Sequence, residues 1–234
     1  MPLILSQRND TLVEWMDRPD CDAVLLQNTY RQFTTINRLL SGWNSIYKNY
    51  IRPILEKKHG RSSILDIGCG GGDIIRLLHK LCEMDGYEVE FTGIDPDTRS
   101  MEYLSSLNWP DSVTFRAVYS HTLVEEKCQF DIVISNHLVH HLNSPQLRSV
   151  CNDAEKLTRE LVIFSDIERS DLGYISFSTI APLIFRNSYI VKDGKISIRR
   201  SYRKPELVQR LPQNWSVRRM FPFRLLATYE NRDG

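Results

Sequence analysis

Between residues 62 and 167, short apolar runs alternate with longer amphipathic stretches, and this alternation limits the chain to a few folds. The apolar runs, each of strand length, are SSILDIG, EVEFTGID, SVTFRAV, FDIVISN and RELVIFSDI. The stretches DIIRLLHKLCEMDG, PDTRSMEYLSSL and PQLRSVCNDAEKLT carry apolar residues every three or four positions, which predicts helices. Strands that alternate with helices form a parallel sheet covered by helices on both faces. We therefore predict an α/β fold.

Two regions depart from this pattern. Residues 22–55 have the apolar spacing of a helix, with a break expected at Ser41-Gly42 and an end at Pro53. Residues 172–203 are apolar and aromatic, then basic, and Lys192-Asp193-Gly194-Lys195 has the composition of a turn. We predict an N-terminal helical cap at 1–59 and a core at 60–234 with a lid insert at about 172–203.

The C-terminal part supplies the last elements. KPELVQRL predicts a short helix, with a proline near its first turn. WSVRRMF and FRLLATYE predict two strands, joined so tightly at Pro222 that an antiparallel pair is expected. The sheet should therefore end in antiparallel strands.

Composition excludes several classes of protein. With 30 basic and 29 acidic residues, the net charge is +1, so we expect no nucleic-acid partner. Five scattered cysteines without a Cys-x-x-Cys pair indicate reduced thiols and a cytoplasmic location. No apolar run approaches the ~20 residues that span a bilayer. Contact of YISFSTIAPLIFRNSYIV with a membrane surface is the alternative to a lid, and Pro182 makes a long helix there less favourable.

The loop ILDIGCGGGD, from Ile64 to Asp73, follows the first predicted strand. Its glycines let a ligand approach the backbone and leave N–H groups free at a helix N-terminus. Asp95 ends the next strand, where a carboxylate can accept hydrogen bonds from a ribose diol. A nicotinamide fingerprint counted from Gly68 would need glycine where the chain has Asp73. An adenosyl-methionine site therefore fits better, and a nicotinamide-dependent oxidoreductase is the alternative.

With GIDPD, FDIVISNHLVHHL and LVIFSDI, this loop resembles the motifs of class I S-adenosylmethionine-dependent methyltransferases, over about residues 60–230. The small-molecule enzymes related to the ubiquinone and menaquinone methyltransferases are most similar. The resemblance implies a Rossmann-like seven-stranded sheet, mostly parallel, with helices on both faces, an antiparallel last strand and the N-terminal helical cap. It implies S-adenosyl-L-methionine as cofactor, S-adenosyl-L-homocysteine as its product, and no metal.

The resemblance also assigns residues by position. Asp66, Gly68 and Gly70 would border the methionine moiety, Asp95 would bind the ribose and Pro96 would lie along the adenine. Asn136 would lie near the sulfonium. The acid that often contacts adenine is missing from AVYSHT, so Tyr119 or Ser120 would replace it. The expected cofactor-binding residues are Asp66, Gly68, Cys69, Gly70, Asp95, Pro96, Tyr119, Ser120, Asn136 and His137.

SNHLVHHLN holds three of the six histidines, His137, His140 and His141. His137 and His141 are four positions apart and could share a helical face. Zinc is nevertheless disfavoured, because this pair lacks a third protein ligand and a Glu in the His-Glu-x-x-His arrangement. In the fold that the resemblance implies, this segment faces the transferred methyl group. A histidine there can accept the proton of a hydroxyl group at neutral pH. We predict His140 or His141 as the base, oriented by Asp166, whereas the alternative is that the histidines only pack the turn.

Large apolar residues in the cap and the insert predict a hydrophobic cover over an apolar acceptor, although a role in helix packing is the alternative. The candidates are Tyr30, Arg31, Phe33, Tyr174, Phe177 and Phe185, with Tyr189 beside them. The stretch SNHL replaces the Asn-Pro-Pro-Tyr signature of enzymes that methylate exocyclic or amide nitrogens, which favours oxygen, with carbon as the alternative. We predict O-methylation of a small, hydroxylated, fairly apolar acceptor (phenolic, quinol or polyketide-like) by a monomer or homodimer. The alternative is a silent cofactor-binding module that acts through a protein partner.

Overall fold

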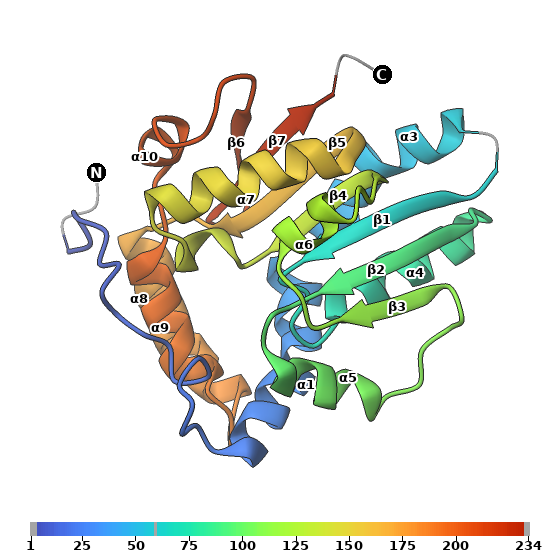
Figure 1. Cartoon of the computed structure of the whole chain (residues 1–234). Coiled ribbons are helices and arrows are strands. Elements are labelled where there is room, and N and C mark those ends of the chain that lie inside the picture. The colour runs from blue at the N-terminus through green and yellow to red at the C-terminus, as the bar shows by residue number, and fades with distance from the viewer. Residues whose placement is uncertain (1–3, 59, 232–234) are drawn as a thin grey trace.

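The computed structural model describes residues 4–58 and 60–231. Its centre is a seven-stranded sheet in the order β3-β2-β1-β4-β5-β7-β6 (Figure 1). The strands are β1 (Ser62–Ile67), β2 (Val89–Ile94), β3 (Val113–Arg116), β4 (Phe130–Asn136), β5 (Thr158–Ile167), β6 (Ser216–Met220) and β7 (Arg224–Glu230). Strands β1 to β5 are parallel, and β7 is antiparallel to both β5 and β6. The predicted mostly parallel sheet with an antiparallel last strand is confirmed.

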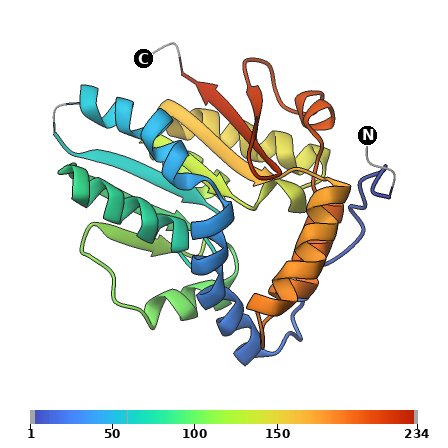
Figure 2. The ribbon, with the colours of Figure 1, turned by 180° about the vertical axis from the view of Figure 1, so that it is seen from behind.

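Helices cover both faces of the sheet (Figures 1 and 2). One face packs against α2 (Trp43–Ile46), the π-helical turn η1 (Tyr47–Ile51), α3 (Arg52–Lys57) and α4 (Asp73–Asp85). The other face packs against α6 (Ser120–Glu125), α7 (Ser144–Leu157) and α10 (Lys204–Val208), and α5 (Thr98–Ser105) connects β2 to β3. Because β1 and β4 are covered on both sides, burial along them is nearly continuous instead of alternating.

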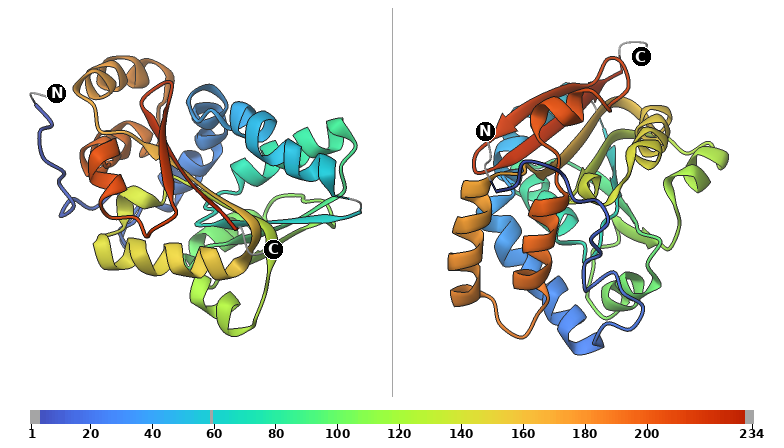
Figure 3. Two further views of the ribbon diagram at one scale, coloured as in Figure 1. Left: turned by 90° about the horizontal axis from the view of Figure 1, so that it is seen from above. Right: turned by 90° about the vertical axis from the view of Figure 1, so that its left-hand side faces the viewer.

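Three further helices stand beyond the carboxyl ends of the parallel strands (Figures 1 and 3). They are α1 (Ala23–Leu40), α8 (Asp171–Ile184) and α9 (Ile190–Arg200). The segment before α1 runs along α9, where the Asn9 N–H donates to the Arg199 carbonyl at 3.0 Å. No helix in the described part of the chain is long and apolar enough to cross a bilayer.

The turn expected at Lys192 to Lys195 is wrong, because these residues lie inside α9. Gly194 serves close packing: a Cβ atom there would collide with the Phe177 ring of α8. Pro182 also lies inside a helix, in the last turn of α8. The insert is therefore a pair of packed helices.

The N-terminal helical region is interrupted at the predicted position, but it ends further along the chain than predicted. Gly42 has φ +73° and separates α1 from α2. Pro53 does not end the helical region, because it lies in the first turn of α3, which continues directly from η1 as far as Lys57. Helix α6 was not predicted. Residue 59, at the expected boundary between cap and core, lies outside the described residues.

The glycine loop between β1 and α4 depends on backbone conformations that other residues rarely adopt. Gly68, Gly70 and Gly72 all have positive φ, at +73°, +49° and +72°. The Gly68 N–H donates to the Ile94 carbonyl at 2.8 Å, which fixes the loop to the end of β2. A Cβ atom on Gly72 would come within 2.8 Å of the Trp109 ring. Backbone hydrogen bonds and close packing therefore define the shape of the loop.

We predict that Gly72→Ala lowers the free energy of unfolding by about 2–4 kcal/mol. A left-handed backbone costs an alanine about 1–2 kcal/mol, and overpacking against Trp109 adds about 1–2 kcal/mol. Gly86→Ala is the matched control, because Gly86 has φ +78° and nothing within 4 Å of the added Cβ. Urea denaturation should show the larger loss for Gly72→Ala, and equal losses would mean that the contact with Trp109 costs nothing.

Candidate active site

A cavity of about 630 Å³ lies at the carboxyl ends of the parallel strands. Its walls come from the loops after β1, β2 and β4, from the start of β7, and from α1, α8, α9 and the N-terminal segment. Open parallel sheets bind ligands at this edge, in the crevice outside the strand ends. The volume is that of a small-molecule site.

Asp95 holds the glycine loop in place at one end of this cavity. Its Oδ2 accepts a hydrogen bond from the Gly70 N–H at 3.0 Å, and its Oδ1 accepts one from the Asp97 N–H at 2.9 Å. Burial raises the pKa of Asp95 above its usual value, although these two N–H donors oppose that shift. Asp95 lines the cavity, so its carboxylate can accept further hydrogen bonds from a ligand.

Two more carboxylates lie beneath the loop. Asp66 is buried, and its Oδ1 has no hydrogen-bond partner among the described residues. Burial, and then the charges of Asp73 and Asp95, raise the pKa of Asp66 well above its usual value. Burial also raises the pKa of Asp73 to about 6, although the Asn37 side-chain amide donates to Asp73 at 2.7 Å. A cationic group bound at this end would therefore be stabilised.

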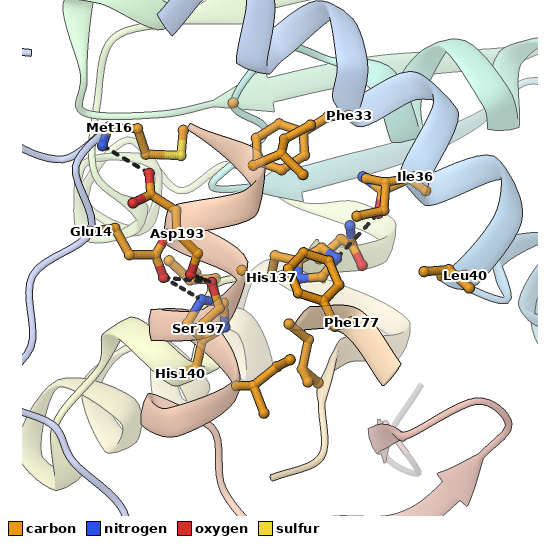
Figure 4. A pocket seen from close by; sticks show the side chains of 18 of the residues that line it. Glu14, Met16, Phe33, Ile36, Leu40, His137, His140, Phe177, Asp193 and Ser197 are labelled. Carbon is orange, nitrogen blue, oxygen red and sulfur yellow. Dashed lines mark hydrogen bonds and ion pairs between the residues drawn. The ribbon is translucent and has the colours of Figure 1, made fainter. Parts of the chain in front are cut away.

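His137 lies in the middle of the cavity, next to a buried guanidinium (Figure 4). Its Nε2 lies 3.1 Å from Arg224 Nη1 and 3.1 Å from Asn37 Oδ1. Burial, and next the charge of Arg224, lower the pKa of His137 well below 6.5, so the imidazole is neutral at neutral pH. Arg224 Nη2 also donates to Asn136 Oδ1 at 2.7 Å. These contacts fix the side chains of His137 and Arg224 next to the carboxyl end of β4.

His140 is buried between two carboxylates. Its Nδ1 lies 2.7 Å from Asp166 Oδ1, and its Nε2 lies 3.2 Å from Glu14 Oε1. The His140 backbone N–H also donates to Asp166 Oδ2 at 2.8 Å. Burial alone would lower the pKa of His140, but the charges and hydrogen bonds of Asp166 and Glu14 raise it to about 9. The imidazole is therefore protonated at neutral pH.

His141 has a different environment, although it follows His140 directly in the short 3-10 helix η2 (Val139–His141). Its Nδ1 lies 3.2 Å from Asp17 Oδ2, whereas its Nε2 lies 3.7 Å from Glu14 Oε1, beyond hydrogen-bonding distance. The side chain is 25% exposed and lines the cavity. His141 is therefore within ion-pair distance of Asp17, whereas both ring nitrogens of His140 are hydrogen-bonded to carboxylates.

The N-terminal segment that carries Glu14 is fixed to α9. The Trp15 and Met16 N–H groups donate to the Asp193 carboxylate at 2.7 and 3.0 Å, and the Ser197 hydroxyl donates to Glu14 at 2.7 Å (Figure 4). Burial raises the pKa of Asp193 to about 6. These hydrogen bonds hold the segment with Glu14 and Asp17 next to His140 and His141.

Two groups have the donor set of a metal site, with ligand atoms within 4.8 Å of one another. One is Glu14, His140 and His141, and the other is His137, His140 and Asp166. Both contain His140, whose raised pKa means that a metal would compete with a proton for this imidazole. The absence of a metal remains a prediction.

The structure brings most of the predicted residues together at the cavity. Those that line it are Gly68, Cys69, Gly70, Asp95, Pro96, Asn136, His137, His140, His141, Tyr30, Phe33, Phe177 and Phe185. Asp66 and Asp166 lie buried behind this lining. Tyr119, Ser120, Arg31, Tyr174 and Tyr189 do not line it. Tyr119 is exposed at the start of α6, and the Ser120 hydroxyl donates to Asp153, so their contact with the adenine stays a prediction.

Sequence reasoning missed Glu14, Asp17, Asn37 and Arg224, all of which line the cavity. Glu14 and Asp17 belong to a segment without periodicity, and Asn37 is one polar residue in an amphipathic helix. Only Arg224 gave a signal, because a basic residue begins the otherwise apolar strand RLLATYE. Their partners are distant in the sequence, so no local motif marks them.

Comparison with known proteins supports this description. Residues 64–160 match the model of a family described as a methyltransferase domain. The plantazolicin methyltransferase BpumL, solved in complex with SAH, superposes with a TM-score of 0.61 at 16% identity over 93% of each chain. Human N-acetylserotonin methyltransferase, solved with SAM, gives a TM-score of 0.63 at 7% identity over 88% of this chain and 55% of that chain. A search of curated proteins finds no match.

Residues 64–160 therefore match a methyltransferase domain, and the fold is similar to that of methyltransferases solved with SAH or SAM. The match begins in β1 and ends in β5, so it includes the glycine loop, Asp95 and the histidine segment. The resemblance found in the sequence is confirmed.

We predict that the free energy of unfolding falls between pH 6.5 and pH 9 because of His140. Its pKa rises from 6.5 to about 9 on folding, so its contribution is complete below pH 6.5 and is lost as the pH rises through 9. The expected decline is on the order of 3 kcal/mol. Urea denaturation across this range should show the decline in the wild type and in His121→Gln, a variant of an exposed histidine. The same decline in His140→Gln would contradict the assignment.

Proposed function

We propose that this protein transfers a methyl group from S-adenosylmethionine to a hydroxyl oxygen of a small, fairly apolar acceptor. The observation that carries the proposal is that one cavity joins an acid-lined glycine loop to a histidine pair held by carboxylates. Two proteins of similar fold are named as methyltransferases of plantazolicin and of N-acetylserotonin. Both named compounds are small molecules, which supports a small acceptor.

The end of the cavity at the glycine loop suits the cofactor. S-adenosylmethionine supplies an electrophilic methyl group on a positively charged sulfur, and it also carries an ammonium group. The unpaired Oδ1 of buried Asp66 and the raised pKa of Asp73 fit a bound cation. Gly68, Cys69 and Gly70 would border the methionine moiety in this arrangement. Asp95 would accept hydrogen bonds from the ribose hydroxyls.

The adenine and the sulfonium complete the cofactor site. Pro96 lines the cavity beside Asp95, where it would lie along the adenine. Asn136 and His137 line the cavity at the end of β4 and would lie toward the sulfonium. His137 is neutral, so it adds no positive charge next to that sulfur. The guanidinium of Arg224 is fixed in place by hydrogen bonds to Asn136 and Ser165.

The other end of the cavity suits an apolar acceptor. Phe33 of α1, Phe177 of α8 and Phe185 directly after α8 supply aromatic walls, whereas Tyr30 packs against Gly71 of the glycine loop. We propose that the insert at about 172–203, together with the N-terminal cap, covers the acceptor and excludes water. Water exclusion strengthens the electrostatic interactions of the transition state.

His141 is the base in this proposal. His140 is protonated and has a carboxylate at each ring nitrogen, so it has no free position for a proton. Asp17 would hold the His141 tautomer that carries its proton on Nδ1, which leaves Nε2 as an acceptor. The acceptor oxygen becomes nucleophilic as Nε2 takes its proton. His140 acts as a positioning residue that anchors Glu14 beside His141.

The described cysteines are consistent with the proposed cytoplasmic location. Cys21, Cys69, Cys82, Cys128 and Cys151 are all free. A reducing compartment keeps thiols in this state.

We predict that Asp95→Ala weakens binding of S-adenosylhomocysteine about 10–150-fold. The variant loses charge-assisted hydrogen bonds to the ribose, worth about 1.5–3 kcal/mol, and the anchor of the glycine loop. Isothermal titration calorimetry measures the change, with NADH as the control ligand. Glu90→Ala, which removes an exposed carboxylate from the same strand, should bind like the wild type. Unchanged affinity of Asp95→Ala would mean that the nucleoside lies elsewhere.

We predict that His141→Gln lowers kcat by ~10²–10⁴-fold, because a positioned general base contributes about this factor. Its affinity for S-adenosylhomocysteine should stay at the wild-type value. Methyl transfer to phenolic acceptors, measured with radiolabelled cofactor, tests both, and His121→Gln is the matched control. Wild-type kcat in His141→Gln would exclude it as the base and leave approximation as the source of the rate.

A further inference from the structure

Three potential metal ligands meet where the N-terminal segment crosses the histidines. His140 Nε2 lies 3.2 Å from Glu14 Oε1, and His141 Nε2 lies 3.7 Å from the same oxygen. The Ser197 hydroxyl of α9 donates to that oxygen at 2.7 Å and fixes the carboxylate (Figure 4). Glu14 lies 126 positions before His140. The third ligand that the histidine pair lacks in the sequence is therefore supplied by the fold.

The distances between these atoms suit a metal ion with three protein ligands. Zinc binds imidazole nitrogen and carboxylate oxygen at about 2.0–2.2 Å, so two ligands of a tetrahedral site are about 3.3–3.6 Å apart. The two N···O distances, 3.2 and 3.7 Å, bracket that range. An ion therefore fits between these atoms with small shifts of the side chains.

The other ring nitrogen of each histidine faces a carboxylate. His140 Nδ1 lies 2.7 Å from Asp166 Oδ1, and His141 Nδ1 lies 3.2 Å from Asp17 Oδ2. Histidines that bind a metal through one ring nitrogen almost always direct the other to a carboxylate, a carbonyl or water, which fixes the ring and raises its basicity. Both imidazoles are thus oriented with Nε2 available to an ion.

The second donor set, His137, His140 and Asp166, is less suitable. Asp166 Oδ1 and His140 Nδ1 are only 2.7 Å apart, closer than two ligands of one ion. The Nε2 of His137 lies 3.1 Å from the guanidinium of Arg224, whose charge repels a cation. Asp166 also does not line the cavity, whereas all three residues of the first set do. An ion in the first set is therefore reached from the cavity, which leaves a coordination position open.

The charge around the first set also favours a dication. Glu14, Asp17 and Asp166 bring three carboxylates to the two imidazoles, and Glu14 and Asp166 are at most 4% exposed. A protonated His140 supplies one positive charge against them. The Arg200 guanidinium donates to the backbone carbonyls of both histidines. A divalent ion in place of the imidazole proton balances one more of the buried negative charges.

We propose that Glu14, His140 and His141 bind a divalent transition-metal ion that inhibits the enzyme. Two imidazoles and one carboxylate are a donor set of zinc, and they also suit cobalt and nickel. The ion replaces the proton between His140 and Glu14 and occupies His141 Nε2. Because this nitrogen is the base of the proposed function, the inhibition rests on that function, whereas the binding does not. The reaction itself uses no metal.

Calorimetric titration of zinc chloride into the protein, after removal of any metal with a chelator, tests the site without methyl transfer. We expect a single ion per chain with micromolar or tighter affinity. Cobalt(II) at the same site should show the visible absorption of a four- or five-coordinate ion without a thiolate band, which excludes ligation by cysteine. No binding, or a cobalt spectrum with thiolate ligation, would overturn the proposal.

Matched variants identify the ligands. His141→Gln removes one ligand and should weaken zinc binding by more than about 100-fold, and Asp17→Asn, which removes the partner of that ligand, by about 10–100-fold. Both residues are partly exposed, at 25% and 39%, so both variants should fold. His121→Gln should bind zinc like the wild type, and so should His137→Gln, which tests the second donor set. Wild-type affinity in His141→Gln would overturn the site.

Methyl transfer in the presence of zinc separates this inference from the proposed function. Turnover of phenolic acceptors that stops at the zinc concentrations at which the ion binds, and returns with chelator, supports both. Turnover that persists in the zinc-bound protein overturns the inhibition. Zinc binding at these residues in a protein that methylates none of the acceptors overturns the proposed function, while the metal site stands.

Discussion

A buried imidazole between two carboxylates connects three distant parts of the chain at this active site. His140 lies in η2 after β4, Asp166 lies at the end of β5, and Glu14 belongs to the N-terminal segment. A buried carboxylate without a partner costs several kcal/mol, so Asp166 and Glu14 both depend on the protonated ring. This contact holds the N-terminal segment across the cavity. It also sets the position of His141, because the two histidines are adjacent in η2.

The two ends of the cavity differ in charge. Near the glycine loop, Asp66 has an unpaired oxygen and Asp73 has a raised pKa, so this end favours a cation. In the middle, burial and the charge of Arg224 keep His137 neutral. Toward α1 and α8 the wall is hydrocarbon. The cofactor and the apolar acceptor that we propose would therefore have separate places in the cavity.

The errors in the sequence-based predictions have a common physical origin. Gly194 suggested a turn because glycine lacks a Cβ atom, but the same property lets α9 pack against Phe177 of α8. Pro53 suggested a helix end, but a proline is equally suited to the first turn of the next helix. Local composition does not separate these uses, because each depends on what packs against the residue.

The sequence by itself determined the sheet, the glycine loop, Asp95 and the histidine segment. Each of these follows from a short apolar period or from residues within one loop, so neighbouring positions carry the signal. Only the tertiary structure decided which histidine meets which acid. Glu14 reaches His140 across 126 positions, and Arg224 reaches His137 across 87. Such contacts depend on how α9, β7 and the N-terminal segment pack around the strand ends, and no local pattern of residues encodes that packing.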